Sequence, residues 1–125
     1  MRARPMNILV IDDNVALCET LSIMLDTLGH RPITALTGYA GVEAAKAQRP
    51  DLILLDLGLP DIDGYETCRQ LREMALLKDV IIVAQSGRDE SEDVEKAKAA
   101  GFDRFIVKPA PFEALQALIA SVENS

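Results

Sequence analysis

Short apolar runs alternate along this chain with longer segments in which apolar residues recur at helical spacing. The run Leu52–Leu55 is continuous, leads straight into Asp56 and is followed by turn-forming residues. An uninterrupted apolar run of this length, closed by turn residues, is typical of a strand that is buried on both faces. The full set of such runs predicts strands over 7–11, 32–36, 52–55, 80–84 and 104–107.

Helical spacing follows each predicted strand. After the first strand, Leu17, Leu21 and Leu25 share one face, Asn14 can cap the first turn and Gly29 is a typical stop signal. Further helices are expected over 39–48, 65–76 and 88–100 and from residue 111 onwards. Strands that alternate with helices of this size predict an α/β fold, with a doubly wound parallel sheet and helices on both faces.

Length and composition favour one ordinary globular domain. A chain of 125 residues can form one core but not two, so residues 1–125 are expected to be a single domain with no second domain in this chain. The net charge of −7 argues against direct nucleic-acid binding and against binding to anionic membranes. No apolar run approaches the ~20 residues that span a bilayer, and no signal peptide precedes the first strand. Cys18 and Cys68 fall on apolar helix faces, as buried free thiols do, so we expect a cytoplasmic protein.

Four of the five predicted strands end at a polar group that can take part in chemistry. The groups are Asp12 and Asp13 after the first strand, Asp56 after the third, Ser86 after the fourth and Lys108 after the fifth. The carboxyl ends of parallel strands lie at one edge of a sheet, where ligands bind in open α/β folds. We therefore expect these five side chains to line one cleft.

The residue types in this set suit phosphoryl chemistry. Crowded carboxylates repel one another unless a cation binds, and oxygen ligands without histidine or cysteine suit Mg²⁺. A carboxylate can attack phosphorus, while a lysine and a hydroxyl can hold the phosphoryl oxygens. Each residue also has an ordinary explanation, as a helix cap, a solvated strand end, a turn residue or a surface charge. Their occurrence at successive strand ends favours the chemical interpretation.

Two other polar features have simpler interpretations. The loop with Asp61 and Asp63 is similar to part of a calcium-binding loop, but the register puts Leu59 at the first ligand position and Gln70 at the last, which excludes that reading. The two aspartates are instead expected to shape the loop and cap the third helix. The only histidine, His30, is expected at a surface turn, and it is a poor candidate for a phosphodonor.

Four motifs, taken in order, resemble those of a known family. They are Ile11–Asp13, Leu55–Gly64, Ala84–Gly87 and Phe105–Pro109. From Ile8 to Val122 the chain resembles the receiver domain of two-component response regulators. The resemblance implies a five-stranded flavodoxin-like sheet in the order 2-1-3-4-5 with five helices on its two faces. It also implies no enzymatic activity beyond the domain's own phosphorylation and dephosphorylation.

The resemblance implies an acceptor and a metal site. Asp56 is expected to accept a phosphoryl group from a histidine kinase or a phosphotransfer protein. Asp13 and Asp56 are expected to bind Mg²⁺, with Asp12 acting directly or through water, and the backbone carbonyl of Gly58 is expected to complete the protein ligands.

The resemblance further implies a switch. Ser86 is expected to hydrogen-bond to the phosphoryl group, Lys108 to pair with it, and Phe105 to turn inward when Ser86 moves. The bond between Lys108 and Pro109 is expected to be cis. The fourth helix, fifth strand and fifth helix are expected to form the face that contacts a downstream protein. Gly58 and Arg88 occupy variable positions that tune dephosphorylation, so the phosphoryl lifetime stays open.

Three alternatives stay open at this point. The chain could be a phosphorylation-independent interaction module that has kept the fold, a receiver fragment of a hybrid kinase or longer regulator, or a phosphatase with a transient aspartyl phosphate. The intact set of acidic residues and lysine argues against the first alternative. The lack of an obvious second acid–base residue argues against the third.

Overall fold

Strands and helices alternate through the whole described chain. The computed structural model describes residues 4–87 and 91–124, with residues 91–94 as backbone. Its elements are β1 (Asn7–Ile11), α1 (Val15–Thr27), β2 (Arg31–Ala35), α2 (Gly38–Gln48), β3 (Leu52–Asp56), α3 (Gly64–Arg72), the 3₁₀-helix η1 (Ala75–Leu77), β4 (Ile81–Ser86), α4 (Ser91–Ala100), β5 (Arg104–Val107) and α5 (Phe112–Glu123). Arg88 and the side chain of Val94, which the sequence pattern assigns to the fourth helix, lie outside the described residues.

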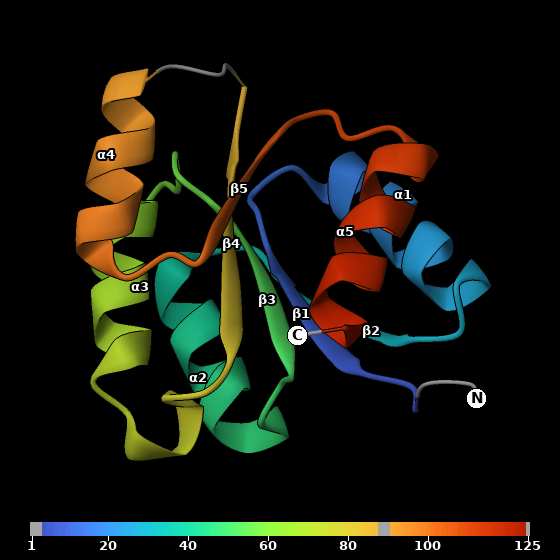
Figure 1. The fold of residues 1–125 in the computed structure, drawn as a ribbon. Coiled ribbons are helices and arrows are strands. Elements are labelled where there is room, and N and C mark those ends of the chain that lie inside the picture. Colours follow the sequence, from blue (N-terminus) through green and yellow to red (C-terminus); the bar gives the residue numbers. More distant parts are fainter. Residues whose placement is uncertain (1–3, 88–90, 125) are drawn as a thin grey trace.

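The five strands form one parallel sheet in the order β2-β1-β3-β4-β5. Figure 1 shows α1 and α5 on one face of this sheet and α2, α3 and α4 on the other. The predicted fold class and strand order are therefore confirmed. Because all strands are parallel, their carboxyl ends lie at a single edge, and the residues that follow them meet there.

The central strand, β3, connects the two halves of the core. All five of its residues are buried, which explains why its sequence is continuously apolar rather than alternating. Leu52 and Leu54 pack with α1 and α5, whereas Ile53 and Leu55 pack with α2, α3 and α4. The alternation follows from the two-residue period of a strand, and it holds Asp56 at the end of a rigid, fully packed element.

Local signals place most of the helix ends. The side chain of Asn14 accepts a hydrogen bond from the Leu17 backbone N–H at 3.0 Å, so it caps α1 as expected. Thr37 caps α2 in the same way through Ala40. At the other end of α2, Arg49 adopts a left-handed conformation with a φ of 48°, because the following proline disfavours the right-handed helical region there.

The third helix is shorter than the sequence pattern predicts. It ends at Arg72 rather than near Leu76, and Ala75 is exposed. The backbone becomes extended at Met74, and the separate η1 helix then places Leu77 in the core with 2% of its surface exposed. The chain therefore leaves the α3 helix and starts a separate helical turn, and this change of direction buries Leu77.

The guanidinium of Arg72 stabilises this helix end. It donates to the carbonyl oxygens of Gly101 and Val80, each at 2.8 Å, and it forms an ion pair with Asp103. Asp103 also accepts the Ile82 backbone N–H at 2.8 Å. These long-range bonds join α3 to the start of β4 and to the turn between α4 and β5, and local sequence patterns do not contain them.

Two further differences concern strand ends and the histidine. The edge strand β2 begins one residue earlier than predicted, at Arg31, and β4 runs to Ser86 rather than ending at Ala84.

His30 is buried, with 6% of its surface exposed, so the prediction that it lies at a surface turn is wrong. Its Nδ1 accepts the Met6 backbone N–H at 3.0 Å, a bond from the segment before β1 that draws the ring inward.

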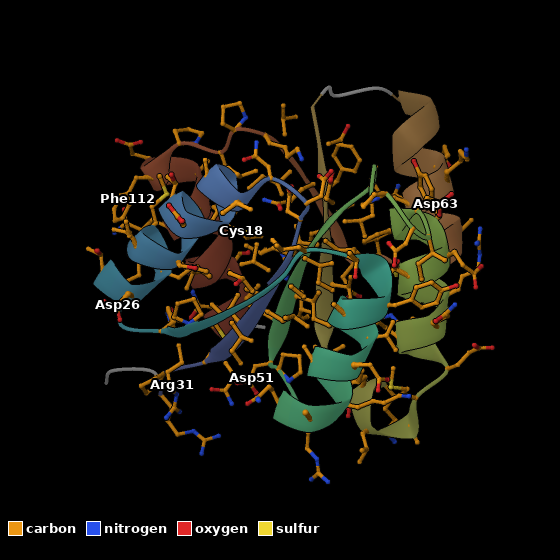
Figure 2. All side chains as sticks on the ribbon, turned by 180° about the vertical axis from the view of Figure 1, so that it is seen from behind. Cys18, Asp26, Arg31, Asp51, Asp63 and Phe112 are labelled. Atoms are coloured by element: carbon orange, nitrogen blue, oxygen red, sulfur yellow. The ribbon has the colours of Figure 1, made fainter. Side chains whose placement is uncertain are left out.

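Both cysteines are buried and free, as predicted. Cys18 lies between α1 and the sheet (Figure 2), and its thiol donates to the backbone oxygen of Asp12 at 3.3 Å. Cys68, on α3, is fully buried in the other layer. Burial raises the pKa of the Cys18 thiol, and it raises the pKa of Cys68 to about 12 from an ordinary value of 9.0.

We predict that neither native thiol reacts readily with Ellman's reagent at neutral pH. For Cys68 the raised pKa lowers the thiolate population about a thousandfold, and burial blocks access as well. Because its folded pKa exceeds the unfolded value of 9.0, Cys68 contributes stability that declines as the pH rises past that value. A Glu43→Cys variant supplies an exposed thiol on α2 as the control, and rapid native reaction of Cys68 would contradict its burial.

The close approach of α3 to β3 generates a second prediction. A Cβ atom on Gly64 would lie 2.4 Å from the backbone oxygen of Asp56, whereas a Cβ atom on Gly58 meets nothing within 4 Å. Gly64→Ala is therefore expected to lower the free energy of unfolding by about 1–3 kcal/mol, and Gly58→Ala to change it by less than about 0.5 kcal/mol. Urea denaturation of the two variants measures the difference, and equal values would contradict the packing.

Candidate functional site

Three carboxylates converge at the carboxyl edge of the sheet. Asp12 and Asp13 directly follow β1, and Asp56 is the last residue of the neighbouring strand β3. One carboxylate oxygen of each residue lies within 4.8 Å of those of the other two. Asp12 is 0% and Asp56 5% exposed, whereas Asp13 is exposed to solvent. The acidic part of the predicted site is thus brought together as expected.

Backbone hydrogen bonds orient the two buried carboxylates. Oδ1 of Asp12 accepts the Asn14 N–H at 2.9 Å, within the turn that starts α1. Oδ1 of Asp56 accepts the Gly58 N–H at 3.3 Å, in the loop that follows β3. Each acid is therefore held by the turn that follows it, Asp12 directly after β1 and Asp56 as the last residue of β3.

Lys108 reaches the same two carboxylates from β5. Its Nζ atom donates to Oδ2 of Asp12 at 2.9 Å and to Oδ1 of Asp56 at 3.0 Å. Its backbone N–H donates to the carbonyl of Ser86 at 2.7 Å, so the residue continues the pairing of β5 with β4. The bond between Lys108 and Pro109 is cis, as expected. The lysine links three strand ends that are distant in sequence.

The electrostatic balance of this cluster favours a further cation. Desolvation works against the charged ammonium, but hydrogen bonds and charge attraction from Asp12 and Asp56 outweigh it and raise the pKa of Lys108. Counted at their ordinary charges, the three carboxylates and the ammonium carry an excess of two negative charges, with Asp12 and Asp56 buried and Asp13 exposed. The donors are hard oxygen atoms, and this donor set fits Mg²⁺.

Ser86 and Phe105 lie on the neighbouring strands β4 and β5. Ser86 is the last residue of β4 and is buried, and Phe105 is half-buried against the layer of α2, α3 and α4. Phe105 is in register with Ala84, two residues before Ser86. Side chains two apart share a face of the sheet, so both side chains are directed towards the layer that contains α4.

One buried polar residue beside the cluster is absent from the predicted set. Gln85 is in register with Asp56 and is 1% exposed, and its Oε1 atom has no hydrogen-bond partner in the described part of the chain. A buried unpaired oxygen of this kind costs about 1–3 kcal/mol. Gln85 falls inside the Ala84–Gly87 motif, and the signal available in the sequence is a polar residue directly after five apolar ones.

The loop from β3 to α3 carries two aspartates with separate partners. Asp63 caps α3, as predicted, by accepting the Glu66 N–H at 2.8 Å, and Figure 2 labels it where that helix begins. Asp61 was predicted to help cap the same helix, and this is wrong. Its carboxylate accepts the N–H groups of Gly38 and Tyr39, at the start of α2. The pairing spans 22 or more residues, so local spacing does not indicate it.

Comparisons with known proteins agree with the fold. The sequence matches the response regulator receiver domain family over residues 8–120. It is 38% identical to the transcriptional regulatory protein AfsQ1 of Streptomyces coelicolor, over 93% of this chain and 50% of that protein. The chain spans about half the length of the first curated relatives it matches. None of the described helices combines the length and apolar character needed to cross a membrane.

Solved structures of receivers superimpose closely on this chain. The chemotaxis protein CheY4 of Vibrio cholerae aligns with a TM-score of 0.91 and 25% identity, over 94% of this chain and 98% of that one. The receiver domain of the sensor histidine kinase PA1611 from Pseudomonas aeruginosa aligns with a TM-score of 0.88 and 30% identity, over 97% and 99%. That structure holds a magnesium ion in its active-site cleft. With the family match covering most of its length, this chain belongs to the response regulator receiver domain family.

Proposed function

We propose that this chain is a phosphorylation-dependent switch in which Asp56 accepts a phosphoryl group from a histidine kinase or a phosphotransfer protein. The observation that carries the proposal is the Lys108 ammonium between two buried carboxylates, Asp12 and Asp56, at the carboxyl edge of the sheet. An ion pair needed only for stability does not require a second buried carboxylate, whose desolvation is costly. A site that must receive a dianionic group does require a cation beside the acceptor.

The transfer step follows from the chemistry of the acceptor. An oxygen of the Asp56 carboxylate attacks the phosphorus of the donor's phosphohistidine, a P–O bond forms, the P–N bond breaks, and its electron pair returns to the imidazole. Lys108 remains protonated, because its pKa is raised, and its ammonium pairs with the incoming phosphoryl oxygens. The Ser86 hydroxyl, at the end of the adjacent strand, donates a further hydrogen bond.

We propose Mg²⁺ as the resident cation. Asp13 and Asp56 would hold it, with Asp12 directly or through water and the backbone carbonyl of Gly58. Magnesium would neutralise charge on the transferring phosphoryl oxygens. The clustered carboxylate oxygens support this assignment, as does the magnesium ion in the related PA1611 receiver. Exposure of Asp13 leaves the site open on one side, as a metal that keeps several water ligands requires.

The proposed output is a change in the face formed by α4, β5 and α5. Ser86 moves towards the phosphoryl group, and Phe105 turns inward into the space this movement leaves. Their common orientation towards α4 supports the relay, and phosphorylation biases an equilibrium between two conformations. A downstream protein, or further domains of a longer regulator, would read this face. The domain acts in the cytoplasm and catalyses at most its own phosphorylation and dephosphorylation.

The acceptor assignment predicts the outcome of a labelling experiment. Incubation with a ³²P-labelled histidine kinase is expected to label the native chain, and Asp56→Ala is expected to abolish the labelling because the attacking oxygen is lost. Asp26→Ala is the matched control, since Asp26 is exposed at the opposite end of α1 from the cluster (Figure 2). Equal labelling of Asp56→Ala and the control would disprove the assignment.

The metal assignment predicts a ligand-dependent gain in stability. Mg²⁺ at about 100 times its dissociation constant should raise the free energy of unfolding by about 2.7 kcal/mol, as measured by urea denaturation. Asp13→Asn is expected to weaken this binding at least about tenfold, because one anionic ligand is lost, whereas Asp26→Asn leaves it unchanged. Identical magnesium titrations for the two variants would remove Asp13 from the ligand set.

A further inference from the structure

The loop between β3 and α3, residues 57–63, connects the acceptor to the rest of the fold. At its start, the Leu57 N–H donates to the carbonyl of Gln85 at 3.1 Å, and the Gly58 N–H donates to the Asp56 carboxylate at 3.3 Å. At its end, the Gly64 N–H donates back to the Leu57 carbonyl at 3.0 Å. The position of this loop therefore determines the orientation of the acceptor and the place of the Gly58 carbonyl.

Asp61 attaches the middle of this loop to a different part of the molecule. Its two carboxylate oxygens accept separate backbone N–H groups, Oδ1 from Gly38 at 2.8 Å and Oδ2 from Tyr39 at 2.9 Å. Both donors lie in the first turn of α2, where unpaired N–H groups and the helix dipole favour an anion. Desolvation opposes ionisation, but these hydrogen bonds outweigh it and keep the pKa of Asp61 below its ordinary value.

The neighbouring residues leave little freedom for another arrangement. A Cβ atom on Gly38 would lie 2.4 Å from Cγ1 of Ile62 and 2.6 Å from Oγ1 of Thr67, so the start of α2 lies directly against the loop and α3. Thr67 itself donates to the carbonyl of Asp63 at 2.8 Å. The loop is thus attached to α2 through Asp61 and to α3 through Asp63.

We propose that Asp61 is a positioning residue for phosphoryl transfer: by binding the start of α2, it holds the loop so that the Gly58 carbonyl and the Asp56 carboxylate face the metal site. This inference rests on the proposed function, because it concerns the same site. Asp61 itself contacts neither the metal nor the phosphoryl group. Its contribution is preorganisation, since a loop already held in place loses less conformational freedom when the ligand binds.

If Asp61 only stabilised the start of α2, its loss would have the same effect as the loss of another cap of that helix. Thr37 is such a cap, so a Thr37 variant distinguishes the structural role from the positioning role. Thr37 caps the same helix by accepting the Ala40 N–H at 3.0 Å, but it belongs to the segment between β2 and α2 and makes no bond to the loop in the described structure. Loss of the Thr37 side chain removes one hydrogen bond from this helix terminus, and loss of the Asp61 carboxylate removes two. Only the loss of the Asp61 carboxylate also detaches the loop from that terminus.

The decisive experiment compares Asp61→Ala, Asp61→Asn and Thr37→Ala with the native chain. Amide hydrogen exchange at Gly58 is measured by NMR in metal-free protein, the dissociation constant of Mg²⁺ is measured by calorimetry, and folding is monitored by urea denaturation. Asp61→Ala is expected to accelerate Gly58 exchange and to weaken magnesium binding about tenfold. Asp61→Asn keeps one acceptor oxygen and is expected to recover part of both losses. Thr37→Ala is expected to lower stability and to leave Gly58 exchange and magnesium affinity at their native values.

The possible outcomes separate this inference from the proposed function. Native Gly58 exchange and magnesium affinity in Asp61→Ala would overturn the positioning role, as would equal losses in Thr37→Ala. If the native chain binds no Mg²⁺, the metal assignment in the proposed function fails. The exchange of the Gly58 amide still decides, without metal, whether Asp61 orders the loop beside the acceptor.

Discussion

The burial of two carboxylates beside one ammonium is the interaction on which this site depends. Asp12 and Asp56 are almost completely removed from solvent, and Lys108 lies between them at hydrogen-bond distance. Without the lysine, the two charges would be desolvated and mutually repulsive, a situation that strongly destabilises a fold or drives protonation. With it, one ammonium contacts both buried carboxylates, and the three carboxylates of the cluster still outnumber this cation. These ion pairs offset the cost of burying the two carboxylates, and the excess of carboxylates is the feature on which the proposed metal and phosphoryl binding rests.

The parallel sheet makes this arrangement possible because each charged group occupies the end of a different packed strand. β3 is buried along its whole length between two helical layers, so its last residue has little freedom to move away from its neighbours. Lys108 arrives from the edge strand β5, through a backbone bond to Ser86. Asp56, the proposed acceptor, ends a fully buried strand, whereas the residues proposed to respond to it, Ser86 and Phe105, lie on β4 and β5.

Two aspartate side chains attach the loop between β3 and α3 to the starts of neighbouring helices. Asp63 binds the start of α3 and Asp61 the start of α2, so the segment that carries Gly58 is attached to two helices that pack side by side. Gly64 allows α3 to begin against the backbone of Asp56, where any larger residue would collide. The bonds that cap these two helices therefore also hold the loop that follows Asp56.

The sequence by itself determined the fold class, the strand order through family resemblance, and the convergence of Asp12, Asp13, Asp56 and Lys108, because apolar periodicity and residues at strand ends are local properties. It also predicted the caps at Asn14 and Asp63, which bind within their own first turns. Only the tertiary structure decided that α3 stops at Arg72, that His30 is buried, that Gln85 lies beside Asp56, and that Asp61 caps α2. Each of these depends on a partner from a distant segment or a neighbouring strand, and the spacing of residues along one chain does not reveal which distant groups will meet.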